Sequence, residues 1–151
     1  MNQKQDRKRK FVRAHSLSIG AGTILTLWII LYWTADPSTH VGAFFGNAIA
    51  DWTGLLVMVI ATKYMYEKGS TESRKPPKDV FGSVLEHIRD HSLTIFLLVT
   101  GLGWVLLYAS MDSESRWGQV VGNIVSEWTQ ILGLVLMTKI LFESHSKESK
   151  H

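Results

Sequence analysis

Four long apolar segments, separated by short polar ones, dominate the sequence. Residues 17–33 and 93–109 contain no charged side chain, and each is long enough to cross about 30 Å of hydrocarbon as an α-helix. Two further segments are also long enough, although each contains one acidic residue near its centre. The pattern predicts transmembrane helices over about 16–34, 41–65, 92–110 and 117–142.

Basic residues lie almost entirely at one end of these predicted spans. Of the 16 Lys and Arg residues, only Arg116 lies in a turn within a hairpin. The other 15 lie before the first span, between the last turn of the second span and the start of the third, or from the last turn of the fourth span onward. The positive-inside rule assigns such regions to the cytoplasm. We therefore predict an all-α membrane protein with four transmembrane helices, arranged as two tandem helical hairpins, with both termini cytoplasmic.

The two predicted hairpins are similar in sequence. A shift of 76 residues aligns 13–73 with 89–149 without a gap, and 22 of the 61 aligned pairs are identical. Several identities are polar or aromatic, which shared hydrophobicity does not explain; in the first hairpin they include His15, Asp36, Asn47, Trp52, Thr62, Lys63 and Glu67. We predict an internal duplication of the parallel class, with a pseudo-two-fold axis along the membrane normal.

This topology divides the chain into five regions. They are a basic cytoplasmic N-terminus (1–14), a first hairpin repeat (15–68), a cytoplasmic linker (69–90), a second hairpin repeat (91–144) and a cytoplasmic tail (145–151). Within the linker, Asp79 is expected to cap a short amphipathic helix that lies in the membrane interface. Its apolar side would contain Val80, Phe81, Val84, Leu85 and Ile88.

Small residues recur every fourth position at the start of the second helix of each hairpin. Such stripes let helix backbones approach closely in a membrane, where lipid gives helices no hydrophobic reason to associate. We therefore predict that these residues pack helices together: Gly42, Gly46, Ala50, Gly118, Gly122 and Ser126.

The same two helices each contain an acid near the middle of the predicted span. An ionised carboxylate at that depth costs a few kcal/mol or more, so it is expected to be protonated, paired or hydrated. Two interpretations remain open: a proton or cation pathway, or a protonated clamp that hydrogen-bonds neighbouring helices. The pathway candidates share one helical face and are Asp51, Glu127, Asn47, Asn123, Thr62 and Thr138.

Charged and imidazole side chains occupy the cytoplasmic ends of the spans. The lysines are expected to extend to the interface, and a His–Glu pair there would either sense pH or join neighbouring helices. These interfacial residues are His15, His91, Glu67, Glu143, Lys63 and Lys139.

Two segments resemble a known family. Trp128-Thr129-Gln130, Thr138 and the ending Ser146–Lys150, together with Lys68–Arg74, are similar to motifs of a family of short bacterial integral membrane proteins of unknown function. The resemblance covers about a third of the chain. It implies a multi-pass protein of the bacterial inner membrane and adds no activity.

Several classes of function are excluded by what the sequence lacks. There is no cysteine, and no P-loop, nucleophile elbow, HExxH or potassium-channel filter motif. We predict no enzyme, no cofactor and no metal, and we interpret the basic N-terminus as a topology signal that meets lipid rather than nucleic acid. The remaining hypotheses are a small proton or cation transport protein, and a scaffold or accessory subunit. Expected partners are membrane lipids and either a second copy of the chain, as a dimer, or another membrane protein.

Overall fold

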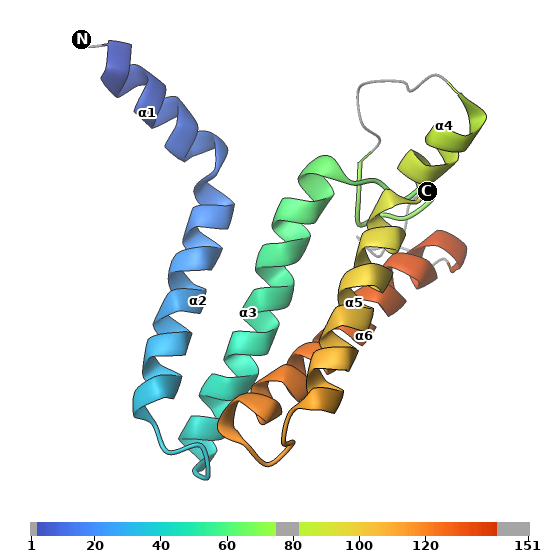
Figure 1. Cartoon of the computed structure of the whole chain (residues 1–151). Helices are drawn as coiled ribbons and strands as arrows, with labels where there is room; N and C mark the ends of the chain where they lie inside the picture. Colours follow the sequence, from blue (N-terminus) through green and yellow to red (C-terminus); the bar gives the residue numbers. More distant parts are fainter. Residues whose placement is uncertain (1–2, 75–81, 142–151) are drawn as a thin grey trace. The chain divides into compact units, whose positions relative to one another are not determined.

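A computed structural model describes residues 3–74 and 82–141, and this part of the chain contains six α-helices and no strand (Figure 1). Four helices are long and apolar enough to cross a membrane: α2 (Ser16–Thr34), α3 (His40–Tyr64), α5 (Ser92–Ser110) and α6 (Arg116–Ile140). The predicted all-α fold with four candidate spans is confirmed, and each helix ends within two residues of its predicted limits. The other two helices are α1 (Gln3–Ala14) and α4 (Ser83–Asp90).

The chain divides into two compact units, Met1–Val59 and Ile60–His151. The first contains α1, α2 and most of α3, and the second contains the end of α3 followed by α4, α5 and α6. Because α3 is a single continuous helix, the boundary between the units lies inside it.

The outer surfaces of the long helices are apolar. In α5, for example, Leu98, Val99, Leu102 and Leu106 are all more than half exposed. A helix that is apolar on all sides is stable only when it is surrounded by other apolar matter, as in a membrane span or the core of a large protein. At 19 residues α5 is about 28 Å long, and at 25 residues α6 is about 37 Å long, enough to cross the hydrocarbon layer.

A hydrogen-bonded turn joins α2 to α3. A carboxylate oxygen of Asp36 accepts from the Ser38 N–H at 2.9 Å, and its carbonyl accepts from the N–H and the hydroxyl of Thr39 at 3.2 and 2.7 Å. The Thr39 hydroxyl in turn accepts from the Gly42 N–H at 3.1 Å, which satisfies one of the unpaired donors at the start of a helix.

The turn between α5 and α6 uses the same contacts 76 residues later. Asp112 accepts from the Glu114 N–H at 3.0 Å and from the Ser115 hydroxyl at 2.6 Å, and Ser115 accepts from the Gly118 N–H at 3.0 Å. A Cβ atom on Gly118 would collide with the Asp112 carbonyl oxygen, as one on Gly42 would with the corresponding oxygen in the first turn. Glycine is therefore required at this position of both turns.

A tyrosine ring covers the next glycine along each helix. A Cβ atom on Gly46 would lie 3.3 Å from the Tyr32 ring, and one on Gly122 would lie 3.0 Å from the Tyr108 ring. These glycines thus let a tyrosine of the preceding helix lie directly against the helix backbone within one hairpin.

The N-terminal segment and the linker differ from the prediction in detail. Residues 1–14 were predicted only as a basic segment, and all but the first two form α1. In the linker, α4 begins at Ser83 with Gly82 as its N-cap residue, at φ +112°, so the prediction of Asp79 as the cap was wrong. Glycine accommodates this conformation, which an aspartate adopts only at a cost. Asp79, Val80 and Phe81 lie outside the described residues, whereas Val84, Leu85 and Ile88 are exposed on α4.

Candidate functional site

The segment that follows α3 contains the most deeply buried polar side chains of the second unit. In residues 66–74, here called the strap, Glu67 and Ser70 are completely buried and Ser73 is 3% exposed. Residues 69–74 were predicted as part of a cytoplasmic linker, and Glu67 was predicted as an interfacial residue at the end of the first hairpin repeat. Buried polar groups are costly unless they are hydrogen-bonded, so the contacts of these residues define the site.

Backbone hydrogen bonds attach the strap to the start of α5. The Tyr66 N–H donates to the Ser92 hydroxyl at 2.9 Å, and the Lys68 N–H donates to the Asp90 carbonyl at 2.7 Å. Within the strap, the Glu67 N–H donates to the Ser73 hydroxyl at 2.8 Å. The backbone on both sides of Glu67 is therefore held in place, and its side chain is directed by that backbone.

The Glu67 carboxylate is the centre of the site. Its Oε1 atom lies 2.7 Å from Nδ1 of His91 and 2.9 Å from Nζ of Lys139, and its Oε2 atom accepts from the Thr94 N–H at 3.4 Å. Because a carboxylate only accepts, both nitrogens donate to it, and His91 carries a proton on Nδ1. One carboxylate thus joins the strap, the start of α5 and the end of α6.

The charge balance at this carboxylate favours its ionised form. Burial raises the pKa of Glu67, but hydrogen bonds with Thr94, Lys139 and His91 and the positive charge of Lys139 outweigh burial and lower the pKa below its ordinary value. The Glu67 side chain is 1% exposed, whereas those of His91 and Lys139 are 27% and 32% exposed. The site is therefore a buried anion held by two partners that reach the surface.

Two further contacts surround this centre. The Ser70 and Thr138 hydroxyls are hydrogen-bonded at 3.0 Å, which gives the strap a second attachment to α6. Asp90, which is 7% exposed, is bound by Arg89 at 2.7 Å and approached by Lys68 at 3.7 Å. Thr138 was predicted as a pathway residue, and its hydroxyl lies at the strap.

The predicted intramembrane acids lie at the centres of the two longest helices. Asp51 is exposed on α3, and Glu127 is half-buried on α6. Of the polar residues expected near them, Asn47 is exposed, and Asn123 and Thr62 are half-buried. The two acids belong to different units, and their role stays a prediction.

The small residues of the stripe are all buried in α3, whereas those of α6 are buried only at the start of the helix. Gly42, Gly46, Ala50 and Gly118 are buried, Gly122 is half-buried and Ser126 is exposed. Because the glycines contact the turn and the tyrosine of their own hairpin, those contacts hold a hairpin together. Packing between hairpins through this stripe stays a prediction.

The predicted interfacial residues are only partly brought together. His91, Glu67 and Lys139 meet in the site, where Nζ of Lys139 lies 2.9 Å from the Glu67 carboxylate, and the extension of the lysines to the membrane interface stays a prediction. His15 stacks near Phe11, with 4.5 Å between ring centroids, and Nζ of Lys63 lies 5.4 Å from the Tyr64 ring centroid. Glu143 lies outside the described residues.

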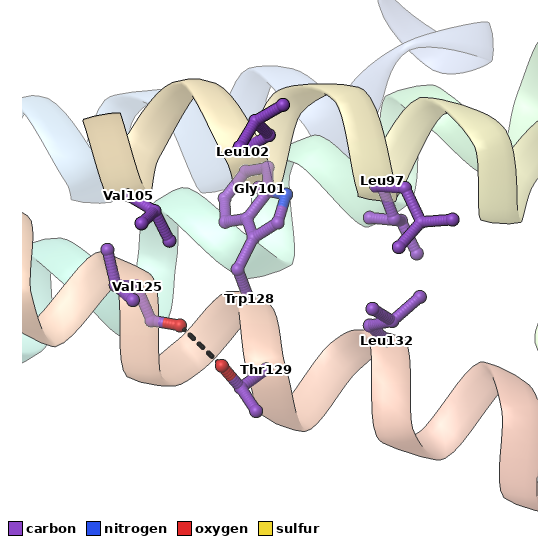
Figure 2. Close-up of a pocket in the computed structure, with 9 residues that line it drawn as sticks. Leu97, Gly101, Leu102, Val105, Val125, Trp128, Thr129 and Leu132 are labelled. Carbon is purple, nitrogen blue, oxygen red and sulfur yellow. Dashed lines mark hydrogen bonds between the residues drawn. The ribbon is translucent and has the colours of Figure 1, made fainter. Parts of the chain in front are cut away.

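An apolar cavity of about 280 Å³ lies between α5 and α6 (Figure 2). Leu97, Leu102 and Leu132 line it together with the Trp128 indole, whose Nε1 donates to the Thr100 hydroxyl at 2.9 Å. Figure 2 also shows the Thr129 hydroxyl bonded to a carbonyl of its own helix. The polar side-chain groups of Trp128 and Thr129 therefore both donate hydrogen bonds within the protein, and the cavity offers space and no reactive group.

Sequence reasoning missed the buried serines and Asp90. Ser70 and Ser73 are short and polar in a segment that contains Gly and precedes two prolines, which is typical of a solvated loop. The signal that pointed to them was the repeat, since both are identical to Ser146 and Ser149. In the described ranges, no three His, Asp or Glu side chains are grouped as metal ligands. Comparison with protein-family models, curated proteins and solved structures finds no match for this chain.

Proposed function

We propose that this chain is a membrane protein that conducts or couples protons or cations, with Asp51 and Glu127 as its protonatable groups. The observation that supports it is the position of these acids, at the centres of two 25-residue helices that are apolar enough to span a membrane. A charged side chain at such a depth costs about 2.5–3.5 kcal/mol on insertion scales. Residues that are this costly in a span generally line pathways or face a partner.

The exposure of Asp51 favours a pathway over a clamp inside one hairpin. A clamp requires the acid to be buried against the neighbouring helix, whereas Asp51 is exposed on α3. In a membrane, an exposed carboxylate at mid-span must meet water or a polar group of another chain or hairpin. Because four helices enclose little space, a homodimer is the assembly that would provide the rest of such a pathway.

The proposed setting is the bacterial inner membrane, with both termini in the cytoplasm and the two hairpins derived by duplication. The support is the distribution of Lys and Arg, the family resemblance and the matching turn contacts at Asp36 and Asp112. In this orientation the strap, residues 66–74, lies on the cytoplasmic side.

Flux measurements in reconstituted vesicles test the proposal. Vesicles loaded with a pH-sensitive dye and given a potassium diffusion potential should acidify or alkalinise faster with the protein than without it. Asp51→Asn combined with Glu127→Gln should abolish that flux, and Asp6→Asn, which changes an exposed acid on α1, should leave it intact. Unchanged flux in the double variant would refute the role of the two acids.

The alternative function is a helix-packing scaffold or accessory subunit of a membrane complex. It predicts that the same double variant alters the mass of the purified assembly while neither protein moves protons or cations. Gly46 and Gly122 lie against Tyr32 and Tyr108, so Gly46→Leu would disrupt the hairpin itself and does not test partner binding. Light scattering of the purified assemblies, beside the flux assay, separates the two functions.

A further inference from the structure

Two imidazole rings meet where α4 joins α5. The His91 N–H donates to the His87 carbonyl at 3.2 Å, so the helical turn continues through the junction and places both residues on one face. His87 is exposed and the His91 side chain is 27% exposed, so the pair is open to solvent. No metal was predicted from the sequence, but the pair has the four-residue spacing at which two histidines of a helix bind one metal ion.

The distance between the two rings suits a shared metal ion. Their centroids are 4.7 Å apart, with 64° between the ring planes. Imidazole nitrogens bind Zn²⁺ at about 2.0–2.1 Å, and two rings that bind one ion in this way have centroids on the order of 5 Å apart. The backbone of the junction therefore already holds the rings at the separation that a shared ion needs.

The Glu67 carboxylate prepares His91 as a ligand. Its Oε1 atom accepts from Nδ1 of His91 at 2.7 Å, so in the neutral ring the lone pair is on Nε2. A carboxylate behind a histidine fixes the tautomer and makes the opposite nitrogen a stronger ligand, and metal-bound histidines usually have such a partner. Nζ of Lys139 lies 3.4 Å from the same Nδ1 atom and 2.9 Å from Glu67, so this cation is on the Glu67 side of the ring and is neutralised there.

We propose that His87 and His91 bind a divalent transition-metal ion that prefers imidazole ligands, such as Zn²⁺, and that Glu67 orients His91 for this role. In the described ranges no third His, Asp or Glu belongs to the group, so water completes the coordination. The three residues belong to one unit of the chain, and the inference does not depend on whether Asp51 and Glu127 carry protons.

The first hairpin contains the same junction without the second imidazole. Phe11 and His15 are 76 positions before His87 and His91, and their ring centroids are 4.5 Å apart. The backbone conformation is nearly the same in both places, at φ −121°, ψ 13° in His15 and φ −122°, ψ 16° in His91. A ring pair at this junction therefore needs no metal to form. His87→Phe is accordingly the matched variant, since it keeps a ring contact that the chain already makes elsewhere.

Calorimetric titration of the tag-free protein with Zn²⁺ in detergent tests the site. Outer-shell partners alone change metal affinity by about 10–100-fold, so loss of a ligand in His87→Phe should weaken binding at least as much. His87→Cys, which exchanges one zinc ligand for another, should retain binding, and so should His40→Phe, which removes an exposed histidine at the start of α3.

Two calorimetric outcomes would overturn the proposal. The first is equal Zn²⁺ affinity in the parent protein and His87→Phe, which would show that His87 is not a ligand. The second is an equal loss of affinity in His87→Phe and His87→Cys, which would show that the substitutions disturb the fold and remove no ligand.

Amide exchange gives a second measurement, because Glu67 also holds the strap. If the closed strap raises the metal affinity of His91 by about 10–100-fold, saturating Zn²⁺ must favour the closed strap by the same factor. The Glu67 and Lys68 amides should therefore exchange about 10–100-fold more slowly with Zn²⁺ in the parent protein, and at an unchanged rate in His87→Phe. Zinc binding without any change in exchange would overturn the role of Glu67 in this site.

Discussion

Replacement of Lys139 by methionine removes the positive charge nearest to Glu67 and keeps most of the length of the side chain. Nζ of Lys139 lies 2.9 Å from Oε1 of Glu67, and the carboxylate would keep His91 as its other side-chain partner. The Glu67 side chain is 1% exposed, so water does not readily replace the missing ammonium group. We therefore expect the strap to open more often in this variant.

The size of the effect follows from the burial of the two partners. Removal of one partner of a buried ion pair costs about 3–5 kcal/mol. Since the Lys139 side chain is 32% exposed, solvent already screens part of the attraction, and the lower end of that range applies. A cost of about 3 kcal/mol corresponds to roughly a 150-fold increase in the population of the open strap.

Amide hydrogen exchange in detergent micelles measures this opening. The Glu67 and Lys68 amides donate to Ser73 and Asp90 at 2.8 and 2.7 Å, so they exchange only when the strap opens. Both should exchange roughly 100-fold or more faster at neutral pH in Lys139→Met than in the parent protein. The removal of a cation that lowers the pKa of Glu67 also raises that pKa, so the difference between the proteins should shrink in acid.

The matched control is Lys10→Met. Lys10 and Asp6 form an ion pair at 2.9 Å in which the side chains are 78% and 49% exposed. Exposed pairs contribute about 0–1 kcal/mol, so strap exchange should not change. If Lys139→Met changed exchange of the Glu67 and Lys68 amides by less than about threefold, the assignment of Lys139 as the main counter-charge would be wrong.

Three further predictions concern other parts of the described structure. Gly118→Ala should destabilise the second hairpin by about 1–3 kcal/mol in dodecyl sulfate unfolding, because its Cβ atom would meet a backbone carbonyl. A Cβ atom on Gly133 has no neighbouring atom within 4 Å, so Gly133→Ala should be neutral or stabilising by up to about 1 kcal/mol. Because the pKa of Glu67 is lowered, the ionised carboxylate stabilises the strap at neutral pH, and this stabilisation is lost as the pH falls from 4.5, the ordinary pKa, through the pKa in the folded protein. Exchange of the strap amides, relative to the rate of an unprotected amide at the same pH, should rise in that window and should stay constant in Glu67→Gln. Trp128→Phe removes the hydrogen bond to Thr100 and should lower the free energy of unfolding by about 0.6–1.7 kcal/mol in the same assay. An unchanged free energy of unfolding would show that this hydrogen bond does not stabilise the protein.

The helical framework could be predicted from the sequence because it depends on one strong signal. Uninterrupted apolar runs of 17 or more residues determine spans almost regardless of context, and both turns have a Ser or Thr before the helix that accepts from a glycine N–H. The cap of α4 was mispredicted because Asp79 is a good capping residue by type, while the helix begins later, after Gly82. Residue type indicates which residues can cap a helix, but the position at which the helix begins depends on the geometry of the chain, which only the structure shows.

The candidate site could be predicted only in part. A pairing of an interfacial His with a Glu follows from their positions at the ends of spans. Those positions do not specify which His meets which Glu, and the structure pairs His91 with Glu67, from different predicted hairpins. The choice of Lys139 as the third member required a path for the chain after α3 that no periodicity encodes. Burial of Ser70 against Thr138 depends on that same path, since a hydroxyl in a loop is ordinarily solvated.

The order of synthesis gives the strap a particular place in folding. Glu67 is made 72 residues before Lys139, so at 5–20 residues per second its cation follows roughly 4–14 s later. During that interval the carboxylate has no ammonium partner from α6 and is best accommodated in water. The contacts of the strap with Lys139 and Thr138 are then among the last to form, after α6 is complete, whereas its contacts with Asp90, His91 and Ser92 require only the start of α5.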